Sequence, residues 1–251
     1  MRRAGFEKLS VFFPMWNEEG YIERAVEAAR EECNELVASG DIADWEIIVV
    51  DDASTDDTPD IARRLAAEDP RVRLVSHPTN RKLGGSMKSG FAAATGDIVL
   101  YTDADLPFDM HEVHRAVRLM RYYEADIVSA WRFDRTGEGY VRTVYSAFYN
   151  LLVRVLFGLR LRDVNFAFKL CRRRIFDDVV LRSEGSFIDA ELMARAVRHG
   201  YRVIQFGVDY FPRTRGVSTL SSPRVILGIL REAFSLRREI RRIRPRATGA
   251  A

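Results

Sequence analysis

Cysteine is scarce in this chain, with only Cys33 and Cys171 among 251 residues. The two lie far apart and match no metal-binding spacing, which argues against a disulfide framework and fits a reducing cytoplasmic setting. Long apolar runs are missing as well. The most apolar stretch, residues 144–161, is interrupted by Arg154 and Arg160, whereas a membrane-spanning helix needs about 20 apolar residues. We therefore expect no segment that crosses a membrane.

The sequence also lacks an evident signal peptide, an internal repeat, a low-complexity stretch and a clear linker. A hydrophobic content of 47% and a charged content of 30% are typical of a globular protein with one buried core. The net charge is only +3, but residues 231–246 carry seven arginines and two glutamates. Such a segment suits an anionic membrane surface or an acidic partner better than specific nucleic-acid recognition, so no nucleic-acid partner is expected.

Apolar runs alternate with amphipathic segments through the first half of the chain. Repeated strand–helix units of this kind predict an α/β fold with a mainly parallel central sheet, helices on both faces, and ligands at the carboxyl ends of the strands. The predicted strands are residues 9–13, 45–50, 72–76, 97–102 and 127–130. The predicted helices are about 21–38, 58–67, 83–94 and 110–123.

The second half is less regular, with predicted helices at 144–157 and 190–199 and predicted strands at 166–171 and 202–208. We expect one domain over residues 1–220, followed by a basic amphipathic C-terminal helix and tail over 221–251. Apolar residues recur in that helix at three- and four-residue steps, backed by arginines. It either lies at an anionic bilayer surface, packs on the core, or forms a homodimer contact.

Carboxylates end two of the predicted strands. Asp103-Ala104-Asp105 follows the strand at 97–102, and a second cluster that begins at Asp51 follows the strand at 45–50. Two carboxylates separated by one residue can hold a hard divalent cation against a diphosphate. Because both strands end at one edge of the sheet, the sequence predicts a nucleotide–metal site there.

Two more segments accompany this edge. Pro14 is expected to end the first strand, which leaves Trp16 and Glu18 on a loop where a ring and a carboxylate can bind a base. The alternative for Glu18 is a favourable charge at a helix start. In the glycine-led segment 84–90, Lys88 can reach a phosphate or a sugar, while the alternative is a helix whose glycines only pack on the sheet. This segment is not a P-loop, because its spacing differs.

The segments 14–18, 50–58, 84–90 and 103–105 occur in this order and together resemble the N-terminal half of glycosyltransferase family 2. These are inverting enzymes of GT-A fold, and the best match is the dolichol-phosphate mannose synthase-like branch, which includes polyprenyl-phosphate glycosyltransferases. The resemblance covers roughly residues 9–220. It implies the GT-A fold, a nucleotide sugar donor of the GDP-mannose or UDP-glucose type, and Mg²⁺ or Mn²⁺ as cofactor.

The resemblance implies donor-site roles residue by residue. Asp51 would accept hydrogen bonds from the base or ribose, and Pro14, Trp16, Glu18, Lys88 and Ala104 would line the same donor. Asp105 would be the direct metal ligand, with Asp103 helping through the metal or the ribose. A glutamine is common in the family where this chain has Pro107, so a water would replace that ligand or the metal would be held more loosely.

Acceptor roles follow in the second half. Arg132 and Arg142 would bind an acceptor phosphate, and Asp163 lies in a segment similar to one in the family, with Ala167 in place of a glycine. Arg213 and Ser218 resemble a mobile loop that closes over the donor diphosphate, with Asp105, Arg213 and Asp163 as the catalytic set. For any single arginine, the alternative is a solvated surface charge.

The leading hypothesis is transfer of a hexose, with inversion, to a polyprenyl phosphate at the cytoplasmic membrane face. A phosphate acceptor has a second pKa of roughly 6 and needs no strong base, consistent with the absence of an obvious catalytic histidine. One alternative is a hydroxyl acceptor on a sugar, peptide or metabolite, for which Asp163, Asp189 or Glu191 would act as base. The other is a nucleotide-sugar-binding protein without turnover.

Overall fold

The structure is a computed structural model that describes residues 5–133, 140–211 and 223–245; within these ranges, the side chains of 140–147 and 223–224 are not described. The described residues form a seven-stranded sheet in the order β3-β2-β1-β4-β6-β5-β7. The strands are β1 (Phe6–Met15), β2 (Ile42–Asp51), β3 (Val72–Ser76), β4 (Ile98–Thr102), β5 (Ile127–Arg132), β6 (Phe168–Arg172) and β7 (Val203–Val208). The helices are α1 (Ile22–Ala38), α2 (Thr58–Glu68), α3 (Lys82–Ala93), α4 (Glu112–Tyr122), α5 (Tyr140–Phe157), the 3-10 turn η2 (Arg173–Asp177), α6 (Ile188–His199) and α7 (Pro223–Arg242).

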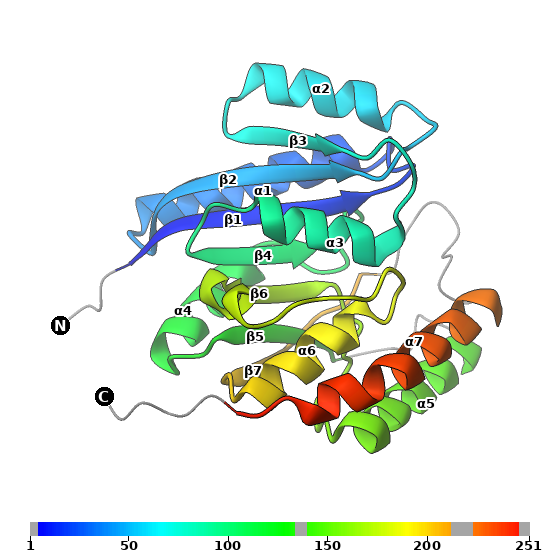
Figure 1. Cartoon of the computed structure of the whole chain (residues 1–251). Helices are drawn as coiled ribbons and strands as arrows, with labels where there is room; N and C mark the ends of the chain where they lie inside the picture. Colours follow the sequence, from blue (N-terminus) through cyan, green and yellow to red (C-terminus); the bar gives the residue numbers. More distant parts are fainter. Residues whose placement is uncertain (1–4, 134–139, 212–222, 246–251) are drawn as a thin grey trace.

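Helices cover both faces of the sheet, with α3, α6 and α7 in front and α1 and α4 behind in the view of Figure 1. Side chains of a strand alternate between the two faces, and β1 shows this directly. Leu9, Val11 and Phe13 belong to the apolar cluster under α1 and α4, whereas Phe12 belongs to the cluster under α3 and α6. The predicted α/β architecture, with helices on both faces, is therefore confirmed.

The sheet is mainly parallel, as predicted, with one reversal. β6 lies between β4 and β5 and runs antiparallel to both. Its register places Lys169 opposite Tyr101, and Phe168 opposite Thr102 at the end of β4. The loop that precedes β6 therefore reaches the same edge of the sheet as the acidic triplet, although it belongs to the second half of the chain.

The first strand is longer than the sequence predicts, because β1 continues through Pro14 to Met15. β1 pairs with β4 over Leu9–Phe12 only, while its pairing with β2 extends to Met15. Pro14 therefore lies where one side of the strand has no neighbour, and proline is tolerated at such an edge because its missing N–H interrupts no ladder.

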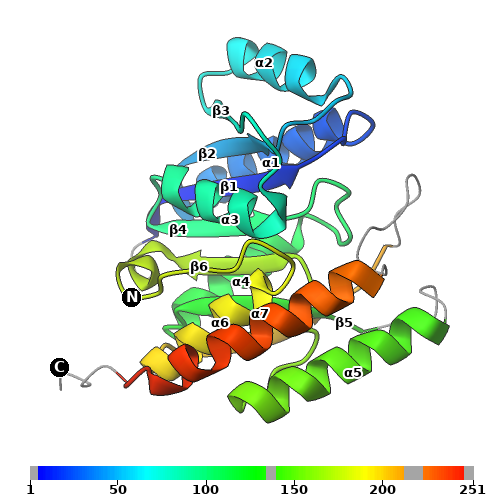
Figure 2. The ribbon, with the colours of Figure 1, turned by 45° about the vertical axis from the view of Figure 1, so that its right-hand side comes forward.

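The terminal helix α7 packs beside α6 and α5, as Figures 1 and 2 show. Ile229, Ala233 and Ile240 are buried in the cluster that α6 also enters. One side of the basic helix therefore packs on the core, while Leu227 and Phe234 on α7 are exposed. Within the described ranges, no helix is both long enough and apolar enough to cross a bilayer. The division of the chain at residue 220 stays a prediction.

Candidate functional site

The loop after β1 and the loop after β2 are locked together at the carboxyl edge of the sheet. The backbone N–H of Asn17 donates to Ser54 Oγ at 3.0 Å, and Asn17 Oδ1 accepts a hydrogen bond from the backbone of Thr55 at 2.8 Å. Asn17 adopts a positive φ of 57°, which asparagine tolerates better than most residues. The loop presents Trp16 with 48% of its surface exposed, and the backbone N–H of Glu18 donates to Thr58 Oγ1 at 2.9 Å.

The two aspartates at the end of β2 have different surroundings. Asp51 is buried and accepts a hydrogen bond from the Ser54 backbone at 3.1 Å. Asp52 Oδ1 accepts from the backbone of Arg81 and contacts His77 Nδ1, both at 2.7 Å. Asp52 therefore fixes the segment that leads into α3. Asp51, the residue predicted to bind the donor, ends the strand itself.

The acidic triplet forms a turn directly after β4. Leu106, with a φ of 47°, donates its backbone N–H to Asp103 O at 3.3 Å, and the Tyr101 hydroxyl donates to Asp103 Oδ1 at 3.4 Å. Burial, followed by the negative charges of Asp105, Asp189 and Glu18, raises the pKa of Asp103 to about 8. The turn thus concentrates carboxylates that repel one another.

These residues fit a divalent metal. Carboxylate oxygens are the ligands that Mg²⁺ and Mn²⁺ prefer, and a bound cation offsets the repulsion between Asp103 and Asp105. Pro107 lies in the same turn, and its carbonyl accepts a hydrogen bond from the backbone of Phe211 at 2.9 Å. This contact brings the segment that precedes residue 212 to the acidic triplet. Arg213 and Ser218, predicted to close over the donor, lie outside the described residues.

A buried ion pair lies beside the triplet. Lys169 on β6 is fully buried, and its Nζ lies 2.5 Å from Asp189 Oδ1 at the start of α6 and donates to Phe166 O at 2.8 Å. Burial raises the pKa of Asp189, against the opposing charge of Lys169. Our sequence interpretation missed Lys169, although a lysine within the apolar run at 168–171 was a signal for it.

Arg132 and Asp163, both predicted from the sequence, are brought together. Arg132 Nε lies 2.6 Å from Asp163 Oδ2, and its Nη2 lies 2.7 Å from Oδ1, so the pair is bidentate and almost fully buried. The guanidinium also faces the rings of Phe166 and Tyr210 at 5.4 and 5.0 Å. The contact ties the end of β5 to the loop before β6. Arg142 is on α5, with its side chain outside the described part.

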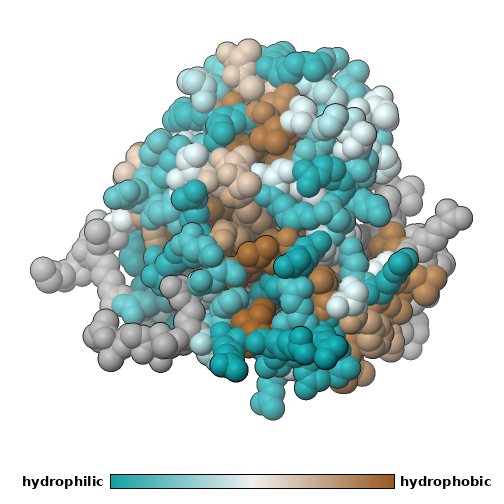
Figure 3. Space-filling model, viewed as in Figure 1, coloured by the Kyte–Doolittle hydropathy of each residue, from teal (hydrophilic) through white to brown (hydrophobic). Residues whose placement is uncertain are grey.

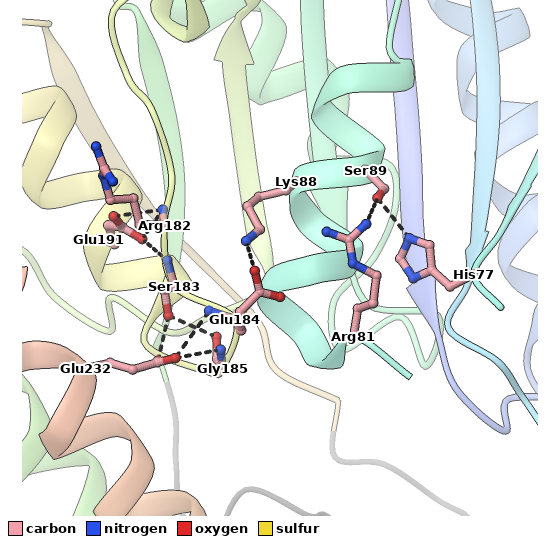
Figure 4. Close-up of polar contacts among 10 residues, drawn as sticks. All are labelled: His77, Arg81, Lys88, Ser89, Arg182, Ser183, Glu184, Gly185, Glu191 and Glu232. Carbon is pink, nitrogen blue, oxygen red and sulfur yellow. Dashed lines mark hydrogen bonds and ion pairs between the residues drawn. The ribbon is translucent and has the colours of Figure 1, made fainter. Parts of the chain in front are cut away.

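The glycines at the start of α3 are explained by packing against the loop at 182–185, part of which is drawn in Figure 4. The backbone N–H of Gly84 donates to Glu184 O at 3.0 Å, and a Cβ at this position would lie 2.4 Å from Ser183 O. Lys88, four residues further along the helix, forms an ion pair with the Glu184 carboxylate. The packing alternative therefore accounts for Gly84, and Lys88 is held by an acidic side chain.

The loop at 182–185 is fixed by two further carboxylates, also drawn in Figure 4. Glu191 on α6 accepts hydrogen bonds from the backbone N–H groups of Arg182 at 3.0 Å and of Ser183 at 2.7 Å, so its carboxylate has a structural role. Glu232 on α7 accepts from Ser183 Oγ at 2.6 Å and from the Gly185 backbone at 3.0 Å. The terminal helix is thereby connected, through this loop, to α3.

Comparison with known proteins agrees with this arrangement. Residues 10–180 match the family described as Glycosyl transferase family 2. Glycosyltransferase AglD of Haloferax volcanii is 37% identical over 98% of this chain, which spans 39% of that protein. Dodecaprenyl-phosphate galacturonate synthase of Rhizobium johnstonii is 29% identical over 93% of this chain and 69% of its own length. Undecaprenyl-phosphate 4-deoxy-4-formamido-L-arabinose transferase of Pseudomonas syringae is 30% identical over 87% of this chain and 62% of its own length.

Solved structures show the same fold. Glucosyl-3-phosphoglycerate synthase from Mycobacterium tuberculosis, in complex with phosphoglyceric acid, has a TM-score of 0.66 at 25% identity, over 91% of this chain and 80% of that one. A structure of the same synthase with Mn²⁺ and UDP-glucose has a TM-score of 0.65 at 24% identity, over 90% and 79% of the two chains. The predicted GT-A fold is confirmed.

Proposed function

Because the chain belongs to glycosyl transferase family 2, we propose that it transfers a hexose, with inversion, from a nucleotide sugar to a polyprenyl phosphate. The observation that carries this proposal is that three aspartates lie at the same edge of the sheet. Asp51 ends β2, and Asp103 and Asp105 follow β4, the two strands that flank β1. Two of the relatives are named for polyprenyl-phosphate acceptors, which supports the acceptor class. The chain covers only part of each relative, so the acceptor remains part of the proposal.

The donor side is assigned to the first half of the chain. Trp16, Glu18 and Asp51 bind the base and ribose, next to the backbone of Pro14 and Ala104. Asp103 and Asp105 hold Mg²⁺ or Mn²⁺, which would supply positive charge to the departing diphosphate. The raised pKa of Asp103 supports this role, because a pair of crowded carboxylates is stabilised by a cation. Lys88 reaches the donor phosphates when it leaves Glu184.

The acceptor side is assigned to the second half. Arg132 and Arg142 position the acceptor phosphate, with Arg132 oriented by its bidentate contact to Asp163. Arg213 and Ser218 close over the donor diphosphate. An ionised phosphate oxygen attacks the anomeric carbon from the face opposite the diphosphate, which leaves with the bonding electrons. No base is needed, since the acceptor is largely ionised at neutral pH.

A lipid acceptor also suits the surface of α5 and α7. Among the side chains that the structure describes on these adjacent helices, five large apolar ones are exposed, and Figure 3 shows apolar residues in this region of the surface. They are Phe148, Leu151 and Val155 on α5, and Leu227 and Phe234 on α7. With the arginines of α7 beside them, this apolar face suits contact with an anionic bilayer. We propose peripheral binding at the cytoplasmic membrane face, where the lipid phosphate is presented.

A hydroxyl acceptor is the second candidate, and one observation favours it. Asp189 is one of the negative charges that raise the pKa of Asp103, so a carboxylate from the second half of the chain lies beside the acidic triplet, and as a base it would have to separate from Lys169. The similar solved structure with phosphoglyceric acid is that of a glucosyl-3-phosphoglycerate synthase. A nucleotide-sugar-binding protein without turnover is the third candidate.

The test is to incubate purified protein with radiolabelled GDP-mannose or UDP-glucose, a divalent cation and polyprenyl phosphate. We expect label in the organic phase only when the lipid is present. Label that moves only to a water-soluble molecule would contradict a lipid acceptor and favour a hydroxyl acceptor. Donor binding measured by equilibrium dialysis, without transfer to either acceptor, would favour the protein without turnover.

A further inference from the structure

Two helices behind the sheet bring together four side chains that the proposed transfer does not use. Glu32 and Glu35 lie one turn apart on α1, and His111 and His114 lie one turn apart at the start of α4. Residues three apart share one face of a helix, so each pair presents its side chains together. α1 and α4 are neighbours in the fold, and the four ligand atoms all lie within 4.8 Å of one another.

The distances between these atoms match a coordination shell. Glu32 Oε2 lies 3.0 Å from His114 Nε2 and 3.2 Å from His111 Nδ1. Glu35 Oε2 lies 3.8 and 3.9 Å from the same two nitrogens. Tetrahedral zinc with bonds of about 2.1 Å has ligand atoms about 3.4 Å apart. The four separations lie on both sides of that value, so a small inward movement of Glu35 completes the shell.

His114 supplies an independent indication of a ligand. Only 5% of its surface is exposed, and its buried Nε2 has no hydrogen-bond partner among the described residues. The contact with Glu32 Oε2 at 3.0 Å is short but lacks hydrogen-bond geometry. A buried polar atom of this kind normally has a partner, and a cation held between the nearby carboxylates of Glu32 and Glu35 would supply one.

We propose that Glu32, Glu35, His111 and His114 form a second metal site, selective for Zn²⁺ or a similar transition metal. Imidazole nitrogens favour such metals, whereas the all-oxygen triplet at 103–105 favours Mg²⁺ or Mn²⁺. Two carboxylates and two neutral imidazoles carry a charge of −2, which Zn²⁺ neutralises. The rings of His111 and His114 are stacked with centroids 4.7 Å apart, so both imidazoles lie on the same side of the cluster.

The proposed ion connects helices that follow the two donor-site loops. α1 comes directly after the loop that carries Trp16 and Glu18, and α4 follows the turn of Asp105. A metal that bridges the helices therefore stabilises the folded chain. The site is structural in type, with four protein ligands and no substrate position.

The test uses the full chain without a polyhistidine tag, stripped of metal with EDTA and dialysed against Zn²⁺ with excess Mg²⁺. The excess Mg²⁺ occupies the acidic triplet, so the amount of zinc that the protein retains measures binding at the second site. His111→Ala and Glu35→Gln are the informative variants, because both side chains are 63% exposed and the fold does not depend on them. Glu31→Gln is the matched control, an exposed glutamate next to Glu32 on the same helix.

We expect one Zn²⁺ per chain in the unmodified protein and in Glu31→Gln, with a dissociation constant at least tenfold weaker in His111→Ala and in Glu35→Gln. Zinc should raise the thermal midpoint of the unmodified protein and of the control more than that of the two variants. Midpoints measured in EDTA show whether the variants fold. Equal zinc retention by all four proteins, or none by the unmodified protein, would overturn the proposal. Neither result bears on sugar transfer, which is assayed separately.

Discussion

Lys169 Nζ lies 2.5 Å from Asp189 Oδ1, and both side chains are buried beside the acidic triplet. Lys169 comes from β6 and Asp189 from the first turn of α6. The lysine offsets part of the negative charge around Asp103, since its positive charge lowers the pKa of Asp103 against the carboxylates that raise it. The pair therefore belongs both to the core and to the electrostatics of the site.

Lys169→Met should destabilise the protein strongly, because it leaves Asp189 buried without its partner. Losing one member of a buried pair costs about 3–5 kcal/mol in the free energy of unfolding, measured by urea titration. The double change Lys169→Met with Asp189→Leu removes the stranded charge and should recover at least half of the loss. A single variant that is as stable as the unmodified protein would contradict the observed pairing.

Asp105→Asn should lower sugar transfer at least a hundredfold, which corresponds to about 2.7 kcal/mol in the activation free energy. The thermal midpoint in EDTA should be unchanged or higher, because Asp105 is one of the charges that crowd Asp103. Initial rates with saturating Mn²⁺ test the first part. Asp209→Asn, at an exposed aspartate, is the control and should keep full activity. Equal rates in both variants would remove Asp105 from the metal site.

Acid stability should depend on Glu46 in β2. Burial acts to raise the pKa of Glu46, but hydrogen bonds from Ser10, Thr95 and Arg73 together lower it from 4.5 to about 2. A carboxyl group whose pKa is lowered by folding stabilises the protein fully above pH 4.5 and loses that effect as the pH falls toward 2. Glu46→Gln should cost about 1–3 kcal/mol at pH 7 and flatten the pH dependence of unfolding in this window.

Unfolding free energies measured at several pH values between 2 and 7 test this prediction. Glu31→Gln, at an exposed position of α1, is the control and should leave both the stability at pH 7 and the slope below pH 4.5 unchanged. An unchanged slope in Glu46→Gln would show that another carboxylate controls the acid transition.

Glu232→Gln should loosen the loop between η2 and α6. The Glu232 carboxylate accepts from Ser183 Oγ and from the backbone of Glu184 and Gly185, whereas a glutamine has only one acceptor oxygen. Amide hydrogens at 183–187 should exchange faster by about tenfold, since a lost charge-assisted hydrogen bond costs about 1.5–3 kcal/mol. Arg231→Gln, the exposed neighbour, should leave their exchange unchanged. Equal exchange rates in the two variants would show that the Glu232 carboxylate does not hold this loop.

Leu227→Gln combined with Phe234→Gln should weaken binding to vesicles that contain anionic lipid. Each side chain contributes about 1.5–3 kcal/mol when it is buried in an apolar environment, so the pair should account for at least a hundredfold in partition. Tyr122→Gln is the control, because Tyr122 is 77% exposed but lies on α4 behind the sheet. Sedimentation with vesicles measures the effect. Equal losses in the control would point to non-specific adsorption.

Much of the fold was predictable from apolar periodicity. Residues 47–50 of β2 and 98–101 of β4 are buried on both faces, and their sequences are correspondingly continuous apolar runs. The passage of β1 through Pro14 was not predictable, because it depends on which neighbour pairs with each part of the strand. The reversal of β6 was not predictable either, since the sequence of a short apolar strand does not indicate whether it pairs parallel or antiparallel to its neighbours.

The candidate site was likewise only partly predictable from the sequence. Asp51 and Asp105 could be placed at one edge, because each directly follows a recognisable strand. The partners of Lys88 and Lys169 could not, because Glu184 and Asp189 come from distant segments whose proximity depends on the packing of α3, β6 and α6. Gly84 could be recognised in the sequence as an unusual residue for a helix. The reason for it could not, because it is a tertiary contact with the loop at Ser183 and Glu184.

The antiparallel strand β6 also has a consequence for how the protein reaches its native state. Lys169 faces Tyr101 only after two segments far apart in sequence have paired, and such long-range pairing is slow because loop closure precedes the gain in contacts. A chain cut after β5 would keep the acidic triplet and the other motifs that we propose to bind the donor, yet lack the lysine beside the triplet. The motifs alone therefore do not make the site, whose electrostatic balance is completed only when β6 joins the sheet.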